Sequence, residues 1–366
     1  MNMNYEDVAH KLRRSIDPSA CLDLPFADGG IRLRSNSAAL LGALDDYFDD
    51  FLGNSTQRKN TAQPIIELEL IETKAVTPPL VLRDWPRPAD KGRKEAYADI
   101  NDARILQKVR TGLLFLQGVE RGLAVGPLAA NLNQVVNFIN NQTMNLWKRR
   151  DWQLCHAAAI AGGAGVVAFA GFSGGGKSTL MLQLMSAGDY RFVSNDRLLI
   201  APYNNVVTAM GIAKMPRVNP GTLLNNPKLT HLLPEERRRA LCDLPKESLW
   251  SLEEKYDVPI TAAFGSNRTL EQGPLRAVVI LDWHRDNPAP TTLSPVDIDN
   301  HPQLLQALMK SAGPFYADKD AHFLPASETL SAESYLQLLT HVPVYKVSGA
   351  ADFQRAVTLC QPLLDN

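Results

Sequence analysis

Apolar and polar residues follow two different patterns along this chain of 366 residues. Residues 31–34 alternate as a short strand, and apolar positions at 40–52 recur at helical spacing. Short apolar or alternating runs, which predict an antiparallel meander, occupy residues 65–71, 96–100, 105–109, 113–116 and 123–125. A helix is predicted over 130–148 because its apolar residues share one face. These elements predict a smaller α+β domain over residues 1–150.

Longer units of strand, loop and helix follow this first domain. Strands are predicted at 165–170, 190–194, 277–281 and 342–347, and helices at 177–187, 303–311, 332–341 and 350–364. Such alternation predicts an α/β domain over residues 151–366 with a mostly parallel sheet. Residues 211–264, rich in proline, asparagine and charge, interrupt the pattern. An insertion of this size favours a lid or a substrate-binding arm.

Composition excludes several classes of protein. The formal net charge is -1, with 38 Lys and Arg against 39 Asp and Glu, which argues against a protein that coats nucleic acid or an acidic membrane. The four cysteines lie far apart without zinc-ligand spacing, so we expect reduced thiols. No run has the length of a membrane span or the pattern of a signal peptide, and we expect a cytoplasmic protein.

The clearest motif is the stretch GFSGGGKS at residues 171–178, which fits GxxxxGK[ST] between a predicted strand and a predicted helix. Glycines let backbone N–H groups turn toward a phosphate, and the following helix adds the positive end of its dipole. Lys177 can reach the β- and γ-phosphates, and the Ser178 hydroxyl can hold Mg²⁺. The predicted nucleotide-binding residues in this stretch are Gly171, Phe172, Ser173, Gly174, Gly175, Gly176, Lys177, Ser178 and Thr179.

A phosphate loop needs an acidic partner, and two candidates follow predicted strands. Asp196 comes after residues 190–194, and Asp282 comes after residues 277–281. Both positions suit a site at the carboxyl ends of strands. Asp282 is either a metal ligand of the Walker B type or the cap of a turn. His156, 15 residues before Gly171, is either a core residue beside an apolar run or part of the site.

Together these residues resemble the catalytic domain of HPr kinase/phosphorylase. The resemblance rests on His156, on GFSGGGKS, on a helix ending at Ala187-Gly188 and on the segment RFVSNDR at 191–197. It is clear over residues 155–200 and loose over the rest of the second half. It implies a P-loop kinase fold and ATP as donor to a serine hydroxyl. It also implies that Lys177 holds phosphates, that Ser178 and Asp196 hold Mg²⁺, and that His156 supports the acid–base site.

Departures from the family pattern put parts of this picture in doubt. Asn195 replaces the first of two paired aspartates, and its neutral amide cannot accept a proton. Either Asp196 serves as the base, or the proton leaves late in a loose transition state, or the protein binds nucleotide without fast transfer. The family's downstream signature is replaced by KMPRVNPGT at 214–222, where Arg217 either clamps phosphates or an anionic acceptor, or is a solvated surface residue.

The sequence therefore predicts a kinase related to HPr kinase, but not HPr kinase proper. We expect it to use ATP and Mg²⁺ to phosphorylate a hydroxyl, either a serine of a partner protein or a small compound. Asp196, His156, Lys177 and Asn195 are its predicted catalytic residues. The alternative is a nucleotide-responsive regulatory protein whose transfer chemistry is weak or lost. The resemblance also implies that a homo-oligomer is possible.

Overall fold

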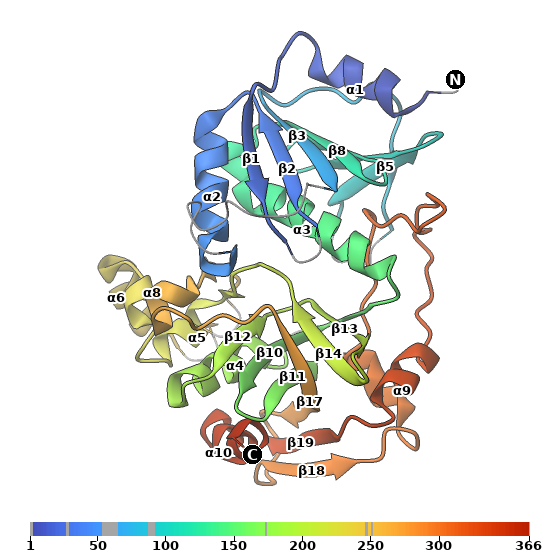
Figure 1. Ribbon diagram of the computed structural model, residues 1–366. Helices are drawn as coiled ribbons and strands as arrows, with labels where there is room; N and C mark the ends of the chain where they lie inside the picture. The colour runs from blue at the N-terminus through green and yellow to red at the C-terminus, as the bar shows by residue number, and fades with distance from the viewer. Residues whose placement is uncertain are drawn as a thin grey trace. The chain divides into compact units, whose positions relative to one another are not determined.

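A computed structural model describes residues 3–26, 29–52, 65–86, 92–172, 174–245, 248–249 and 252–365 (Figure 1). The chain forms two compact units. Unit 1 contains Met1–Arg150 together with Ser311–Thr329, and unit 2 contains Asp151–Lys310 and Leu330–Asn366. Both units combine helices with sheets, so the fold is mixed α/β. No helix among the described residues combines the length and the apolar character needed to cross a membrane.

Unit 1 is built on one sheet of eight strands in the order β1-β2-β3-β8-β7-β6-β5-β4. The strands are β1 (Ala20–Leu24), β2 (Ile31–Ser35), β3 (Ile66–Glu72), β4 (Arg83–Asp84), β5 (Glu95–Asp99), β6 (Arg104–Lys108), β7 (Leu113–Gln117) and β8 (Arg121–Gly126). The helices are α1 (Tyr5–Arg13), α2 (Ala38–Leu52) and α3 (Leu132–Lys148).

The predicted meander in unit 1 is correct for β5–β8, which pair antiparallel in sequence order, but wrong for β3. β3 pairs in parallel with both β2 and β8, as the registers Ile31↔Ile66 and Leu68↔Gly122 show. The cause lies in the connections, because α2 carries the chain from β2 back to the start of β3 and so allows a parallel neighbour. The short apolar run of β3 does not distinguish parallel from antiparallel pairing.

Unit 2 has a nine-stranded sheet arranged around β10, β11 and β17, which lie side by side (Figure 1). Its strands are β9 (Gln153–Cys155), β10 (Ala157–Gly162), β11 (Gly165–Gly171), β12 (Arg191–Ser194), β13 (Leu198–Tyr203), β14 (Val206–Gly211), β17 (Gln272–His284), β18 (Thr292–Val296) and β19 (Val344–Ala350). Helices α4 (Lys177–Ala187), α9 (Glu333–Leu339) and α10 (Phe353–Asp365) pack around it.

The expectation of a mostly parallel sheet is wrong. Among the described pairings of this sheet, only β11 with β17 and β17 with β19 are parallel. β10 turns directly into β11 through the pair Gly162↔Gly165, and so short a connection can join only antiparallel strands. The predicted helix at 303–311 is also wrong, because a 3₁₀ helix ends at Ala307 and Met309 then bridges to Cys155.

The sheet of unit 2 carries helices on both faces. α4 and α10 contact β10 and β11 on one face. On the other face, Ala157, Ala159, Val166 and Ala168 share a core cluster with Tyr335 and Leu339 of α9. The glycine-rich segment that follows β11 leads directly into α4 on the first of these faces.

An arm of short elements lies between β14 and β17. It consists of β15 (Arg217–Val218), α5 (Pro220–Leu224), α6 (Glu235–Cys242), β16 (Tyr256–Asp257) and α8 (Ile260–Phe264). The side chains of Thr222 and Asn226 join the arm to α4. The hydroxyls of Thr179 and Thr222 are 2.7 Å apart, and Asn226 Nδ2 donates to Ser186 Oγ at 2.8 Å.

Arg268 secures the C-terminal end of α4. Its Nη2 donates to the carbonyls of Met185 and Gly188, both at 3.0 Å, and its Nε donates to the Tyr190 carbonyl at 2.7 Å. The last carbonyls of a helix have no partner within the helix, so one side chain here satisfies groups that would otherwise need water.

We expect Arg268→Met to lower the free energy of unfolding by about 2–4 kcal/mol, because it leaves several half-buried carbonyls without a donor. Urea unfolding measures the loss. Arg239→Met is the matched control, since that side chain is 78% exposed and pairs with Glu235 on its own helix; its removal should cost about 0–1 kcal/mol. Equal losses in the two variants would contradict this role for Arg268.

Candidate functional site

The site forms where β10 starts, between the ends of two neighbouring strands. β10 runs antiparallel to both β11 and β12, with Ala157 opposite Ala170 and Ala159 opposite Ser194. The residue that precedes β10 therefore lies beside the residues that follow β11 and β12. These are His156, the glycine-rich loop and Asn195-Asp196, which are far apart in sequence.

A second set of pairings brings the same residues closer. β9 pairs with β13 through Cys155↔Leu198, so His156 lies where the chain passes from β9 to β10. Asn195, Asp196 and Arg197 lie where it passes from β12 to β13. Here His156 Nε2 is 3.1 Å from Asp196 Oδ1. The structure thus joins the predicted residues His156 and Asp196 in one contact.

Lys310 is part of this site, although the sequence analysis did not find it. The backbone N–H of His156 donates to the Leu308 carbonyl at 2.6 Å, which aligns residues 308–310 with β9. Lys310 Nζ then lies 3.1 Å from Asp196 Oδ2. Residue 310 fell within a predicted helix, and no spacing in the sequence relates it to Asp196.

The glycine-rich loop joins β11 to α4, as the sequence predicts. Gly174 and Gly176 have positive φ angles of 79° and 86°, which favour glycine. Among the described residues no side chain caps α4, whose first turn therefore offers backbone N–H groups without intrahelical partners. Ser173 lies outside the described residues, and Phe172 is 61% exposed.

Two aromatic side chains hold this loop in place. Trp283 Nε1 donates to the Gly175 carbonyl at 2.9 Å, and the Trp283 ring stacks edge-on against Phe353 at 4.9 Å. A Cβ atom on Gly176 would come within 2.7 Å of the Phe353 ring. Neither aromatic residue was identified from the sequence, and Trp283 follows Asp282 directly.

Lys177 is buried at the base of the loop. Its Nζ donates to the carbonyls of Gly171 at 2.7 Å and Phe172 at 3.2 Å. Burial lowers the pKa of Lys177 to about 8, an effect that the charge of Asp196 opposes and the charge of Lys310 assists. These three charged groups therefore act on one another within a single site.

Asp196 stays ionised despite its surroundings. Burial alone would raise its pKa, but the hydrogen bond from His156 and the charge of Lys310 together lower the pKa far below its usual range. Its side chain still keeps 43% of its surface exposed. A carboxylate that is ionised, partly exposed and surrounded by donors suits a metal ligand better than a proton acceptor.

The donor atoms present fit a hard divalent cation. Asp196 offers a carboxylate, Ser178 a hydroxyl and Asn195 an amide oxygen, and Mg²⁺ prefers oxygen ligands. The Asn195 Oδ1 atom is buried and has no hydrogen-bond partner among the described residues. This orphaned acceptor shows that the amide at position 195 retains an oxygen that a metal or a bound water could use.

The arm contributes further cations. Burial, together with the charge of Arg197, lowers the pKa of Lys214 to about 8, and burial also lowers the pKa of Arg197. Arg217 Nε lies 3.0 Å from Asp257 Oδ1 as an ion pair. Arg217 is therefore paired within the arm, and its predicted role as a phosphate clamp stays a prediction.

Asp282 lies at the same edge of the sheet, because it follows the part of β17 that pairs in parallel with β11. Its Oδ2 is 3.6 Å from Lys346 Nζ on β19. Asp282 lies within β17, which extends to His284, so its interpretation as the cap of a turn is wrong, whereas its role as a metal ligand stays a prediction.

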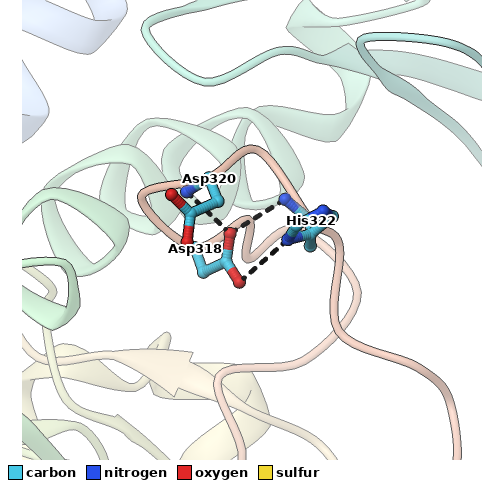
Figure 2. Close-up of side chains that lie close together, drawn as sticks. All are labelled: Asp318, Asp320 and His322. Carbon is cyan, nitrogen blue, oxygen red and sulfur yellow. Dashed lines mark hydrogen bonds and ion pairs between the residues drawn. The ribbon is translucent and has the colours of Figure 1, made fainter.

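A separate cluster in unit 1, Asp318, Asp320 and His322, also brings potential ligand atoms together (Figure 2). The Asp318 carboxylate accepts the backbone N–H groups of Asp320 and His322, both at 2.9 Å. Such side-chain to backbone hydrogen bonds are typical of a turn, and we assign no metal site to these three residues.

Comparisons with known proteins add little to this picture. No family model matches the chain, and no curated protein matches its sequence. Among solved structures, the Hpr(Ser) kinase/phosphatase from Coxiella burnetii matches with 12% identity and a TM-score of 0.29, over 57% of this chain and 89% of that one. A likeness of this degree carries no functional argument, so function has to be inferred from the site itself.

We expect Gly176→Ala to destabilise the protein more than Gly174→Ala. Both changes place a side chain at a positive φ, which costs about 1–2 kcal/mol. Only at residue 176 does the new Cβ meet packed rings, whereas nothing lies within 4 Å at residue 174. Displacing the Phe353 ring should add about 1–3 kcal/mol, measured by urea unfolding. Equal losses would show that the ring yields without cost.

Proposed function

We propose that this chain is an ATP- and Mg²⁺-dependent phosphotransferase that transfers the γ-phosphoryl group to a hydroxyl. The observation that carries the proposal is the convergence of Lys177, His156 and Asp196 beside an uncapped helix that starts after a glycine-rich loop. These groups supply the parts that phosphoryl transfer needs: amides and an ammonium for the phosphates, and a carboxylate for the metal.

Binding of the phosphates falls to the loop and to α4. The first N–H groups of α4 and its dipole favour an anion there. The ammonium of Lys177 would exchange its two backbone carbonyls for phosphate oxygens, which are stronger acceptors. The contacts of Trp283 with Gly175 and Phe353 would support the loop during such binding.

Asp196 and Ser178 would hold Mg²⁺, with the Asn195 amide oxygen or a water as a further ligand. Bound Mg²⁺ neutralises charge on the phosphates. His156 donates to Asp196 Oδ1 and so fixes the orientation of the carboxylate. This contact makes His156 a positioning residue in the proposed site.

The low pKa of Asp196 makes it a weak base, and Asn195 is no base at all. The proton of the acceptor hydroxyl would then leave late, as a loose transition state allows. Catalysis would come mainly from positioning and from charge neutralisation. The acceptor is a serine of a partner protein or a small hydroxyl compound, and the arm cation Lys214 favours one that carries negative charge.

A transfer assay with γ-labelled ATP, Mg²⁺ and candidate acceptors tests the proposal. We expect labelled acceptor with the wild-type protein and at least about a 100-fold loss with Lys177→Ala, because the loop then lacks its only ammonium. Lys319→Ala, a change in unit 1 outside the site, is the control and should retain full transfer. Equal transfer by wild type and Lys177→Ala would exclude this site.

Asn195→Asp separates the kinase from the alternative function, a nucleotide-responsive regulatory protein. That alternative draws support from the neutral amide at residue 195. Tight ATP binding without transfer in wild type, together with transfer in Asn195→Asp, would favour it over the kinase. If the wild-type protein transfers the phosphoryl group and Asn195→Asp does not transfer it faster, catalysis by positioning is favoured over catalysis by a base.

We expect ATP affinity to fall as pH rises through about 8. Below that pH the ammonium of Lys177 is already present in the free protein, and above it binding must take up a proton. The fall should reach up to about tenfold per pH unit. Titrations at pH 7, 8 and 9, followed by tryptophan fluorescence, measure it. Lys214 has a similar pKa, so Lys214→Met should keep most of the fall and Lys177→Met should lose it; an unchanged affinity would contradict the assignment.

A further inference from the structure

Each oxygen of the Asp196 carboxylate faces a cationic or potentially cationic group. His156 Nε2 lies 3.1 Å from Oδ1, and Lys310 Nζ lies 3.1 Å from Oδ2. Arg197 Nε is more distant, at 3.9 Å from Oδ2. The oxygen that faces Lys310 is therefore already engaged by a full positive charge.

Lys310 is held in this position by the backbone. Met309 bridges to Cys155, and the N–H of Lys310 lies 3.4 Å from the Tyr335 hydroxyl. That hydroxyl in turn donates to the Leu154 carbonyl at 2.5 Å. The Met309 bridge and the Tyr335 hydroxyl thus fix the backbone of Lys310, and the four-carbon side chain reaches from there to Asp196.

A divalent cation and an ammonium compete for the same carboxylate oxygen. Mg²⁺ binds oxygen ligands at about 2.0–2.1 Å in near-octahedral geometry. An ammonium therefore cannot share the lone pair that Mg²⁺ uses. Two positive charges around one carboxylate also repel each other strongly in a partly buried site. Metal binding at Asp196 therefore requires Lys310 to move.

We propose that Lys310 is an internal counter-ion of the metal site: it holds Asp196 Oδ2 in the nucleotide-free protein and leaves when the metal enters together with a nucleoside triphosphate. The inference rests on the proposed role of Asp196 as a metal ligand. The phosphates provide the negative charge that the displaced ammonium needs, close to Lys177. The free protein consequently binds a bare divalent cation weakly, and the nucleotide–metal complex is the form that binds.

The chain contains a matched control for this inference. Lys346 and Asp282 form a similar pair at the same edge of the sheet, with 3.6 Å between Nζ and Oδ2 and a carboxylate of nearly equal exposure, 42% against 43% for Asp196. Within the described part of the chain, Lys346 is the cation that pairs with Asp282. If any loss of positive charge near this edge of the sheet tightened metal binding, Lys346→Met would bind the metal as tightly as Lys310→Met.

Binding of Mn²⁺ to the purified full-length protein, followed by electron paramagnetic resonance, tests the inference without any turnover. In the absence of nucleotide we expect Lys310→Met to tighten Mn²⁺ binding by about 10-fold, within the range typical of coupled binding events. Lys310→Arg, which keeps the charge, should bind as weakly as wild type. Lys346→Met should match wild type, and Lys310→Met combined with Asp196→Asn should lose the gain.

A non-hydrolysable ATP analogue supplies the second half of the experiment. With the analogue present, we expect the Mn²⁺ affinities of wild type and Lys310→Met to differ by about twofold or less, since the phosphates then compensate the displaced ammonium. Lys310→Gln serves as a second neutral variant if Lys310→Met does not fold, and thermal unfolding of each variant checks this.

Unchanged or weaker Mn²⁺ binding in the folded neutral variants would overturn the inference, and so would equal tightening in Lys346→Met. This failure is distinct from failure of the proposed function. Phosphoryl transfer by wild type together with unchanged Mn²⁺ binding in Lys310→Met would reject the counter-ion and keep the kinase. Tighter Mn²⁺ binding in Lys310→Met, without phosphoryl transfer to any acceptor by wild type, would keep the counter-ion and reject the kinase.

Discussion

The antiparallel pairing of β10 with both β11 and β12 is the constraint on which the candidate site depends. Because β10 runs against both neighbours, its first residue lies where they end. One strand register therefore sets the distance from His156 to Asp196 and the approach of both to the glycine-rich loop. A slip of one residue in β10 would reverse the faces of all its side chains and separate these groups.

Buried positive charge is a second feature of the candidate site. Lys177 and Lys214 are buried enough that their pKa values fall to about 8, so the protein bears a cost for keeping them charged at neutral pH. Asp196 offsets part of that cost, and a polyphosphate would offset more. The formal net charge of -1 does not oppose this, since the relevant field is local.

The sequence predicts the parts of this site that are local. The strand Gly165–Gly171, the helix Lys177–Ala187 and the glycine-rich loop between them follow from periodicity and motif. Lys310 could not be found, because the backbone pairing that brings it near Asp196 joins Cys155 with Met309, two residues that are 154 positions apart in sequence. Likewise, Ser311–Thr329 joins unit 1 through Arg104, whose Nη1 donates to the carbonyls of Pro314 and Leu324, and no pattern in that segment indicates this partner.

Asn195 and Lys310 together distinguish this site from one with paired carboxylates. Two adjacent ionised aspartates would repel each other and would bind a cation strongly even without nucleotide. An amide at residue 195 removes one negative charge, and Lys310 compensates the one that remains. The one remaining carboxylate, Asp196, is thereby paired with an ammonium. If Asp196 holds the metal as proposed, its affinity for the metal depends on the phosphates that arrive with the metal, which would link metal binding to nucleotide binding.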